Sequence, residues 1–137
     1  MKIAVVSSMQ NAEKMIEIRD ALINLGHDAF VTKFTEPMIG KNDHDKEEMK
    51  LHQKYNLDAI REFWNAMQGA EAILVLNINK DGIENYIGGN TFLEMGFAHV
   101  LNQKIFLYNP IPEISYYKTE IIAMKPIIIN GDLSLIK

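Results

Sequence analysis

The sequence contains no cysteine, which excludes disulfides, thiolate metal sites and cysteine nucleophiles together. It also lacks a cluster of lysine and arginine, and its formal net charge is -4. We therefore expect no nucleic acid polymer as a partner, because the phosphates of a polymer require a basic face. Long apolar runs are absent too, so we expect no membrane partner, no signal peptide and a cytoplasmic location.

The four histidines lie far apart in the sequence, at His27, His44, His52 and His99. None of them forms a pair at metal-ligand spacing beside a cluster of carboxylates. We therefore expect neither a metal site nor a cofactor.

The residues that are present are typical of one globular domain over 1–137, with 47% hydrophobic and 23% charged residues. Apolar runs predict five strands, at 2–6, 28–34, 72–77, 104–109 and 126–130. Apolar residues at helical spacing predict helices at 12–25, 46–68 and 91–102, with a short one inside 110–125. Strands that alternate with helices imply a parallel sheet. We predict an α/β fold with a single doubly wound, flavodoxin-like sheet of order 2-1-3-4-5 and helices on both faces.

Ligands of such sheets bind beyond the carboxyl ends of the strands, where the strand order reverses. This rule brings together three loops, at residues 7–11, 77–90 and 109–113. The predicted binding site lies where these loops meet.

Four polar side chains of these loops are candidate substrate-binding residues. Ser7 and Ser8 follow the first strand, where their hydroxyls either bind a ribose or phosphate or cap the next helix. Asn77 and Asn109 end the third and fourth strands. Each asparagine either faces the ligand or bonds a local turn, which is the commoner use of this residue.

The helix predicted at 46–68 is longer than a sheet of this size needs. We expect its first half, around 49–55, to project and to contact a second copy of the chain. The expected assembly is a homodimer or a higher homo-oligomer.

The stretch NYIGGNTFLEMGFAHV, Asn85 to Val100, carries the functional signal and has two interpretations. In the structural one, Thr91 and Glu94 have the spacing of a capping box, in which each side chain bonds the backbone amide of the other residue. Gly96 then serves to let the helix lie close to the sheet. Nothing chemical is needed to account for the pattern.

The chemical interpretation uses the same residues. Backbone amides at a helix start, here Gly88, Gly89, Asn90 and Thr91, form an anion site suited to a phosphate or a sugar hydroxyl. Glu94 then lies one turn inside that site, where a carboxylate can attack an electron-poor carbon such as C1' of a nucleoside. The two interpretations differ in the direction of the Glu94 side chain.

The stretch GGNTFLEMGFAHVLNQKIFLYN, after the strand AILVLN, resembles the nucleoside 2-deoxyribosyltransferase-like superfamily from about Gly69 to Asn109. The shared motif is a glycine-containing turn, then Glu94, Gly96 and Ala98 on one helix, then a strand. Members of this superfamily exchange bases on deoxyribosides or hydrolyse the N-glycosidic bond of nucleoside 5'-monophosphates. The resemblance implies that Glu94 is the nucleophile and that a second subunit completes the site.

Transferases of the superfamily carry an aspartate six residues before the nucleophile, where this chain has Gly88. They carry another on the preceding helix, for which Asp58 is the candidate second catalytic acid here. The alternative is that Asp58, like Glu62 and Asp81, is a solvated surface residue. We expect an enzyme that cleaves the N-glycosidic bond of a nucleoside or nucleotide, or transfers its base, through Glu94. The alternative is a non-catalytic nucleotide-binding module of the same fold.

Overall fold

Five short strands form one parallel sheet in the order β2-β1-β3-β4-β5, as the sequence predicts. The structure, a computed structural model, describes residues 1–137. All neighbouring strands pair in parallel, so their carboxyl ends meet at one edge of the sheet. The strands are β1 (Lys2–Val6), β2 (Asp28–Phe30), β3 (Ala72–Val75), β4 (Lys104–Leu107) and β5 (Ile127–Ile128).

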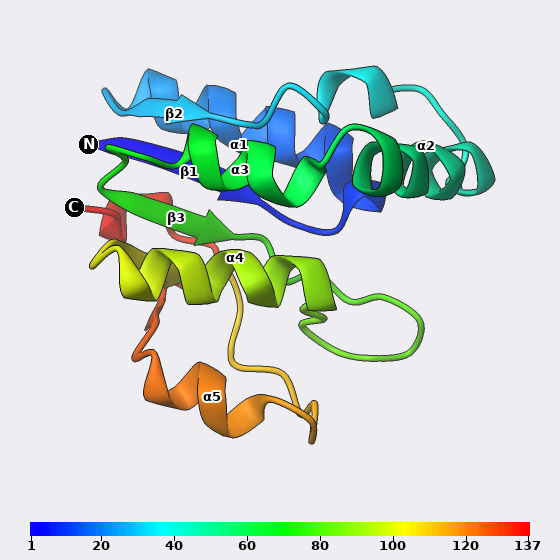
Figure 1. The fold of residues 1–137 in the computed structure, drawn as a ribbon. Coiled ribbons are helices and arrows are strands. Elements are labelled where there is room, and N and C mark those ends of the chain that lie inside the picture. The colour runs from blue at the N-terminus through cyan, green and yellow to red at the C-terminus, as the bar shows by residue number, and fades with distance from the viewer.

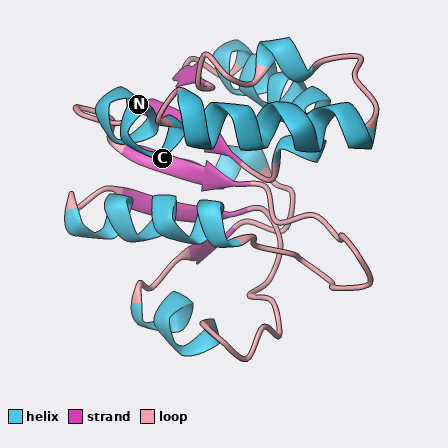
Figure 2. Ribbon diagram, turned by 45° about the vertical axis from the view of Figure 1, so that its right-hand side comes forward, coloured by secondary structure: helices cyan, strands magenta, loops and turns pink.

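Helices cover both faces of this sheet, as predicted (Figures 1 and 2). Alternate residues of β1 show the two layers, because Val5 packs in the core beneath α1 while Val6 packs in the core beneath α3 and α4. No helix combines the length and the apolar character needed to span a bilayer. The helices are α1 (Ala12–Asn24), α2 (Asp43–Asn56), α3 (Ala59–Ala66), α4 (Gly89–Val100) and α5 (Lys118–Ala123), with short 3-10 turns η1 (Met9–Asn11), η2 (Glu36–Met38) and η3 (Leu133–Leu135).

The single helix predicted at 46–68 is wrong, because the chain forms two helices there. α2 ends at Asn56 and α3 begins at Ala59, with Asp58 between them in the left-handed conformation, at φ 50°. Aspartate tolerates this conformation better than most residues. Its side chain also caps α3, by accepting a hydrogen bond from the Arg61 amide at 3.3 Å. The break lets α2 lie beyond the carboxyl ends of the strands while α3 stays on the sheet (Figure 1).

Two buried polar side chains anchor α2 to the rest of the domain. Lys46 donates to Glu13 Oε2 at 2.7 Å and to the Gln10 carbonyl at 3.3 Å. Gln53 donates to the Phe34 carbonyl, also at 3.3 Å. α2, which corresponds to the first half of the predicted helix, is therefore held against η1 and the chain after β2 and does not project freely. The expected homo-oligomer stays a prediction.

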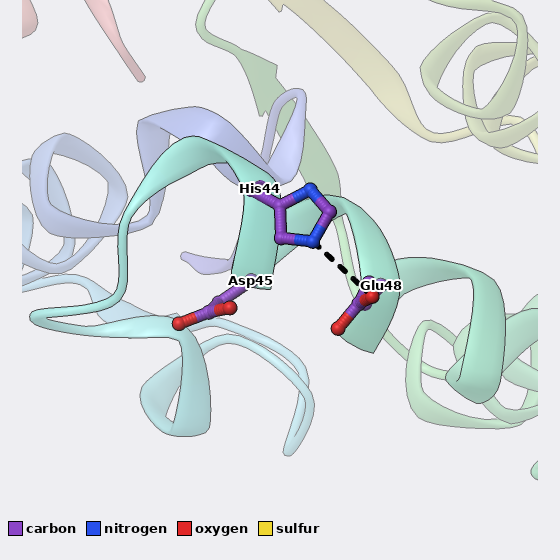
Figure 3. A group of neighbouring side chains, drawn as sticks. All are labelled: His44, Asp45 and Glu48. Carbon is purple, nitrogen blue, oxygen red and sulfur yellow. Dashed lines mark ion pairs between the residues drawn. The ribbon is translucent and has the colours of Figure 1, made fainter.

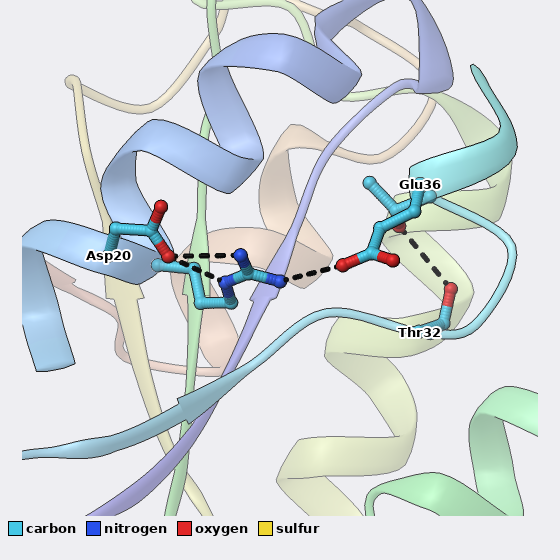
Figure 4. A network of polar contacts seen from close by, with 5 residues as sticks. Asp20, Thr32 and Glu36 are labelled. Atoms are coloured by element: carbon cyan, nitrogen blue, oxygen red, sulfur yellow. Dashed lines mark hydrogen bonds and ion pairs between the residues drawn. The ribbon is translucent and has the colours of Figure 1, made fainter. Parts of the chain in front are cut away.

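A polar network around Arg19 of α1 holds the chain after β2 (Figure 4). The Arg19 guanidinium lies 2.9 Å from Asp20 Oδ1 and 3.3 Å from Glu36 Oε1. The hydroxyls of Thr32 and Thr35 lie 3.5 Å apart in the same segment. Ion pairs with exposed carboxylates contribute only about 0–1 kcal/mol each. The main consequence of the network is that it fixes the path of this segment toward α2.

Candidate functional site

A cavity of about 110 Å³ lies at the carboxyl ends of β1 and β3, where the strand order reverses. One buried water needs roughly 15 Å³ of such space, so the cavity has room for a larger ligand. We call it the switch-point cavity. It is lined by Ser7, Ser8, Met9, Thr32, Phe34, Lys50, Gln53, Lys54, Ala59, Phe63, Lys80, Tyr86, Gly88, Gly89, Asn90, Thr91 and Glu94.

The start of α4 forms one wall of the cavity and leaves backbone amides free. Gly88 is the N-cap, and no side chain caps the helix. Phe92 is the first residue whose amide is bonded, to the Gly88 carbonyl at 2.9 Å, so the amides of Gly89, Asn90 and Thr91 have no acceptor in the protein. Free amides and the helix dipole together favour an anion at this place.

The capping box predicted for Thr91 and Glu94 is absent, so that expectation is wrong. α4 begins two residues before Thr91, which places Glu94 in the second turn and out of reach of the cap position. Thr91 is 3% exposed and Glu94 is 7% exposed, and neither side chain forms a hydrogen bond with the protein. Two buried polar side chains therefore line the cavity without a protein partner.

The Glu94 carboxyl is strongly perturbed by its surroundings. Burial raises its pKa to about 8, because a carboxylate without hydrogen bonds loses the solvation of its charge. The charge of Lys54 acts in the opposite direction and lowers this pKa. The carboxyl is therefore mainly protonated at neutral pH and ionises as the pH rises through about 8. No other carboxyl lines the cavity.

Three lysines give the cavity its positive charge. Lys50 forms an ion pair with Glu47 at 2.6 Å, and Lys80 donates to Ser8 Oγ at 3.1 Å. Lys54 forms neither an ion pair nor a hydrogen bond. Burial, followed by repulsion from Lys50, lowers the pKa of Lys54. The lysines make this wall complementary to an anionic ligand.

Both candidate serines line the cavity and both hydroxyls are bonded within the protein, but Ser8, which also accepts from Lys80 Nζ at 3.1 Å, is the less buried of the two. The Ser7 hydroxyl donates to the Leu76 carbonyl at 2.7 Å and accepts from Asn11 Nδ2 at 2.9 Å. It therefore ties β1 to the chain after β3. The hydroxyl of Ser8 donates to Gln10 Oε1 at 2.6 Å and is only half-buried, so it remains open to the cavity.

The candidate binding residues Asn77 and Asn109 do not line the cavity. Asn77 Nδ2 donates to the carbonyls of Asn109 and Pro110, at 2.8 and 2.9 Å. Asn77 Oδ1 accepts from the Asn109 amide at 2.8 Å, and Asn109 Nδ2 donates to the Asn77 carbonyl at 3.0 Å. We call these four hydrogen bonds the asparagine clamp. It joins the chain segments that follow β3 and β4 and uses both polar atoms of the Asn77 side chain and the Nδ2 of Asn109.

Asp58, the candidate second acid, also lies outside the cavity lining. Its side chain is 56% exposed, caps α3 and forms an ion pair with Arg61 at 3.0 Å. Glu62, the other carboxylate of this helix, pairs with Lys33 at 3.2 Å. The structure therefore brings no second carboxylate to Glu94.

The glycines around the motif have different surroundings. A Cβ at Gly88 would lie 3.4 Å from the Tyr86 ring, whereas a Cβ at Gly89 or Gly96 would meet nothing within 4 Å. The expectation that Gly96 lets α4 lie close to the sheet is therefore wrong, because this position faces open space. At Gly89, the open space lies beside the free amides and leaves them accessible.

His44, Asp45 and Glu48, at the start of α2, form a group of potential metal ligands (Figure 3). Histidine spacing alone does not reveal the group, because two of its three members are carboxylates. His44 Nε2 lies 3.3 Å from Glu48 Oε1, with side chains that are 79% and 69% exposed. Exposed acidic groups are common without a metal, and this one lies outside the switch-point cavity.

The lysines are the part of the cavity that sequence patterns do not single out. Lys50, Gln53 and Lys54 share one side of a helix because they are spaced by three and four residues. The spacing does not tell which element that side faces, and the break at Asp58 decides it. Lys80 lies in a loop predicted to meet this edge of the sheet, which is the available signal for it.

Comparisons of this chain with models of protein families, with curated proteins and with solved structures gave no match. The basis for a function is therefore the geometry of the switch-point cavity, together with the motif around Glu94.

Proposed function

We propose that the switch-point cavity binds a nucleoside or nucleotide and that Glu94 is the nucleophile that opens its N-glycosidic bond. The observation that carries this proposal is the Glu94 carboxyl, which is buried, lacks a protein hydrogen bond and is the only carboxyl in the lining. A carboxyl that lies in a cleft, has no hydrogen-bond partner in the protein and has a strongly raised pKa is a candidate functional group. The resemblance of the surrounding motif to the nucleoside 2-deoxyribosyltransferase-like superfamily supports the same role.

In the proposed reaction, the ionised Glu94 carboxylate forms a bond to C1' while the bond from C1' to the base nitrogen breaks. The base nitrogen keeps the bonding electron pair and takes up a proton. Water or a second base then attacks C1' and releases Glu94, which gives hydrolysis or base transfer. Because the ionised form is needed, kcat/KM should rise with pH through the Glu94 pKa of about 8.

The start of α4 supplies the place for a phosphate or a sugar hydroxyl. The amides of residues 89–91 are free, and Lys80 approaches from the loop after β3, where Ser8 holds it at 3.1 Å. Amides at a helix start and a nearby ammonium both stabilise an anion. This arrangement favours a substrate that carries a phosphate, such as a nucleoside 5'-monophosphate.

A non-catalytic nucleotide-binding module is the second candidate function, and one observation favours it. No second carboxyl accompanies Glu94, because Asp58 pairs with Arg61 and Gly88 stands six residues before the nucleophile. No carboxylic acid is thus in place to protonate the leaving base. Such a module binds the same ligand through the amides and lysines without cleaving it.

Release of free base separates the two functions. The protein is incubated with ribonucleosides, deoxynucleosides and their 5'-monophosphates, and free base is measured by chromatography. We expect release by the wild type and at least a roughly 100-fold loss in Glu94→Gln, which keeps the shape of the side chain but removes the nucleophile. Asp58→Asn is the matched control, because asparagine caps a helix as well as aspartate does. Equal release by wild type and Glu94→Gln would overturn catalysis by Glu94.

Ligand-induced stabilisation tests the binding step by itself. A ligand that binds only the folded protein raises its melting temperature by mass action. A nucleotide that raises the melting temperature but yields no base favours the binding module. If no nucleoside or nucleotide does either, the proposed ligand class is wrong.

A further inference from the structure

Lys54 is the cation of the switch-point cavity that has no partner in the protein. The other two are occupied: Lys50 pairs with Glu47 at 2.6 Å, and Lys80 donates to Ser8 Oγ at 3.1 Å. Lys54 lines the same cavity but forms no ion pair and no hydrogen bond. Its charge is therefore available to another group.

Two buried side chains hold in place α2, the helix that carries Lys54. Gln53, the preceding residue, is buried and donates to the Phe34 carbonyl at 3.3 Å. Lys46, about two turns earlier, donates to Glu13 Oε2 at 2.7 Å. With α2 anchored at these two points, the backbone of Lys54 is fixed beside the cavity and only its side chain is free to adjust.

Glu94 is the cavity group that needs a counter-charge. The titratable side chains of the lining that face it come from two elements, Lys50 and Lys54 from α2, and Lys80 and Tyr86 from the loop before α4. The segments from α3 and from the chain after β2 contribute no titratable side chain to the lining. Of the lysines, Lys54 is the one whose charge acts on Glu94.

We propose that Lys54 is a positioning residue, whose ammonium is the counter-charge that favours the ionised form of Glu94 and directs its carboxylate at C1' of the substrate. This inference rests on the proposed function for the role of Glu94, but the pairing of the two residues is testable without activity. A buried carboxylate without hydrogen bonds ionises at a high cost in free energy, and an opposite charge close by offsets that cost. The flexible lysine stem lets the ammonium follow the carboxylate when a ligand enters.

The hydrogen-bond partners of the lysines indicate a different role for each. Lys80 donates to Ser8 and Gln10 and keeps one N–H for a phosphate at the start of α4, whereas Lys54 is left for Glu94. Loss of Lys54 should therefore change the titration of Glu94 and leave the binding of inorganic phosphate nearly unchanged.

A direct test is the titration of Glu94 followed by NMR of the side-chain carboxyl carbons. Protein labelled with carbon-13 in glutamate is titrated, and the Glu94 signal is identified as the one missing in Glu94→Gln. In Lys54→Met we expect the Glu94 midpoint to move upward by about one pH unit, and in Lys54→Arg to stay near that of the wild type. Lys14→Met, which removes a surface charge of α1, is the matched control and should not move the midpoint. An unchanged midpoint in Lys54→Met would overturn the proposal.

Two further measurements separate this proposal from its alternatives. If Lys54 binds the phosphate instead, Lys54→Met loses affinity for inorganic phosphate in calorimetry while the Glu94 midpoint stays unchanged, which also overturns the proposal. Where base release is detected, the rising limb of kcat/KM against pH should move upward in Lys54→Met and return in Lys54→Arg. If the wild type releases no base, the proposed function fails, and the NMR titration still decides the pairing. Lys54→Gln serves as the second variant if Lys54→Met does not fold.

Discussion

Two lysines of α2, Lys46 and Lys54, lie about two turns apart, and each acts on one glutamate. Lys46 lies 2.7 Å from Glu13, and its hydrogen bond, with another from the Gly40 amide at 3.0 Å, lowers the pKa of Glu13 to about 2. Lys54 forms no bond to Glu94, and burial raises the pKa of Glu94 to about 8. Both lysines lower the pKa of the glutamate they act on, but only at Glu94 does burial outweigh the lysine.

The difference lies in the hydrogen-bond donors that reach each carboxylate. Glu13 is half-exposed and accepts from an ammonium and an amide, so its charge is stabilised within the protein. Glu94 is buried and accepts from nothing, so its charge is stabilised only by a lysine at a distance. The first pair fastens α2 to α1, and the second leaves a carboxyl without a hydrogen bond in the cavity. The number of hydrogen-bond donors around the glutamate therefore distinguishes a structural ion pair from a candidate functional site.

The largest expected effect is on the stability of the Glu94→Gln variant as a function of pH. The folded-state pKa of about 8 lies above the ordinary value of 4.5, so the native protein binds more protons between these values. The stabilisation from protonated Glu94 is complete below about pH 4.5 and is lost as the pH rises through 8. At pH 8 we expect Glu94→Gln to exceed the wild type by roughly 2–4 kcal/mol in free energy of unfolding.

Urea denaturation of both proteins at several pH values between 5 and 8 measures this effect. The gap between the two curves should widen as the pH rises. A constant difference in free energy of unfolding would show that the pKa of Glu94 is not raised. The contrast between the pKa values of Glu13 and Glu94 would then be wrong.

The next largest effect is expected for Lys46→Met. This change removes the ammonium that bonds Glu13 and the Gln10 carbonyl, and we expect a loss of about 2 kcal/mol in free energy of unfolding. The loss stays below that of a fully buried pair because Glu13 is 48% exposed and can be solvated. Lys54→Met is the comparison, since Lys54 bonds nothing and its loss should be nearly neutral for stability. Equal losses of unfolding free energy in the two variants would contradict the view that Lys46 is structural and Lys54 is not.

A smaller effect is expected for Glu13→Gln in acid. The folded-state pKa of about 2 lies below the ordinary 4.5, so the stabilisation from Glu13 is present above about pH 4.5 and is lost as the pH falls through 2. We expect the variant to be about 1 kcal/mol less stable than the wild type at neutral pH, a modest value because the carboxylate is half-exposed. Thermal unfolding monitored by circular dichroism should show the gap closing toward pH 2. A gap that stays constant down to that pH would mean that Lys46 does not hold Glu13 ionised.

The smallest expected effect is on the stability of the Gly96→Ala variant in α4. A methyl group at Gly96 meets nothing within 4 Å, so Gly96→Ala should stabilise the protein by about 0.5–1 kcal/mol through helix propensity. It should leave the Glu94 titration unchanged. Gly89→Ala is the partner variant, because its methyl group stands beside the free amides and should weaken phosphate binding. A destabilised Gly96→Ala would show that α4 lies closer to its surroundings than the structure has it.

Strand order and the position of the site follow from sequence patterns, because they depend on local periodicity and on general rules for parallel sheets. Ser8 and Gly88, from the loops after the first and third strands, line one cavity as the loop rule predicts, whereas the loop at 109–113 contributes no residue to the lining. The break at Asp58 does not follow, since a left-handed residue inside an apolar periodicity is imposed by the packing of α2 and α3. The break sets the direction of α2. The presence of Lys54 in the cavity therefore cannot be predicted from the sequence either.

The capping box shows a second limit of pattern matching. A Thr-x-x-Glu spacing fits a helix that begins at Thr91, but the two glycines before it allow the helix to begin earlier. Two residues of difference convert Glu94 from a cap into a buried, unpartnered carboxyl. The asparagines show another limit, because β3 and β4 end at Val75 and Leu107, two residues before the predicted ends. Asn77 and Asn109 lie just beyond them and hydrogen-bond each other.

The asparagine clamp bears on how this protein can diverge. It fixes the two chain ends that follow β3 and β4, while Ser7 fixes the chain after β3 to β1 by its bond to the Leu76 carbonyl. The long loop between Asn77 and Gly88 therefore leaves from a point that is secured independently of the loop's own sequence. Substitutions and length changes in that loop can therefore alter the part of the cavity wall formed by Lys80 and Tyr86 while the start of the loop stays in place.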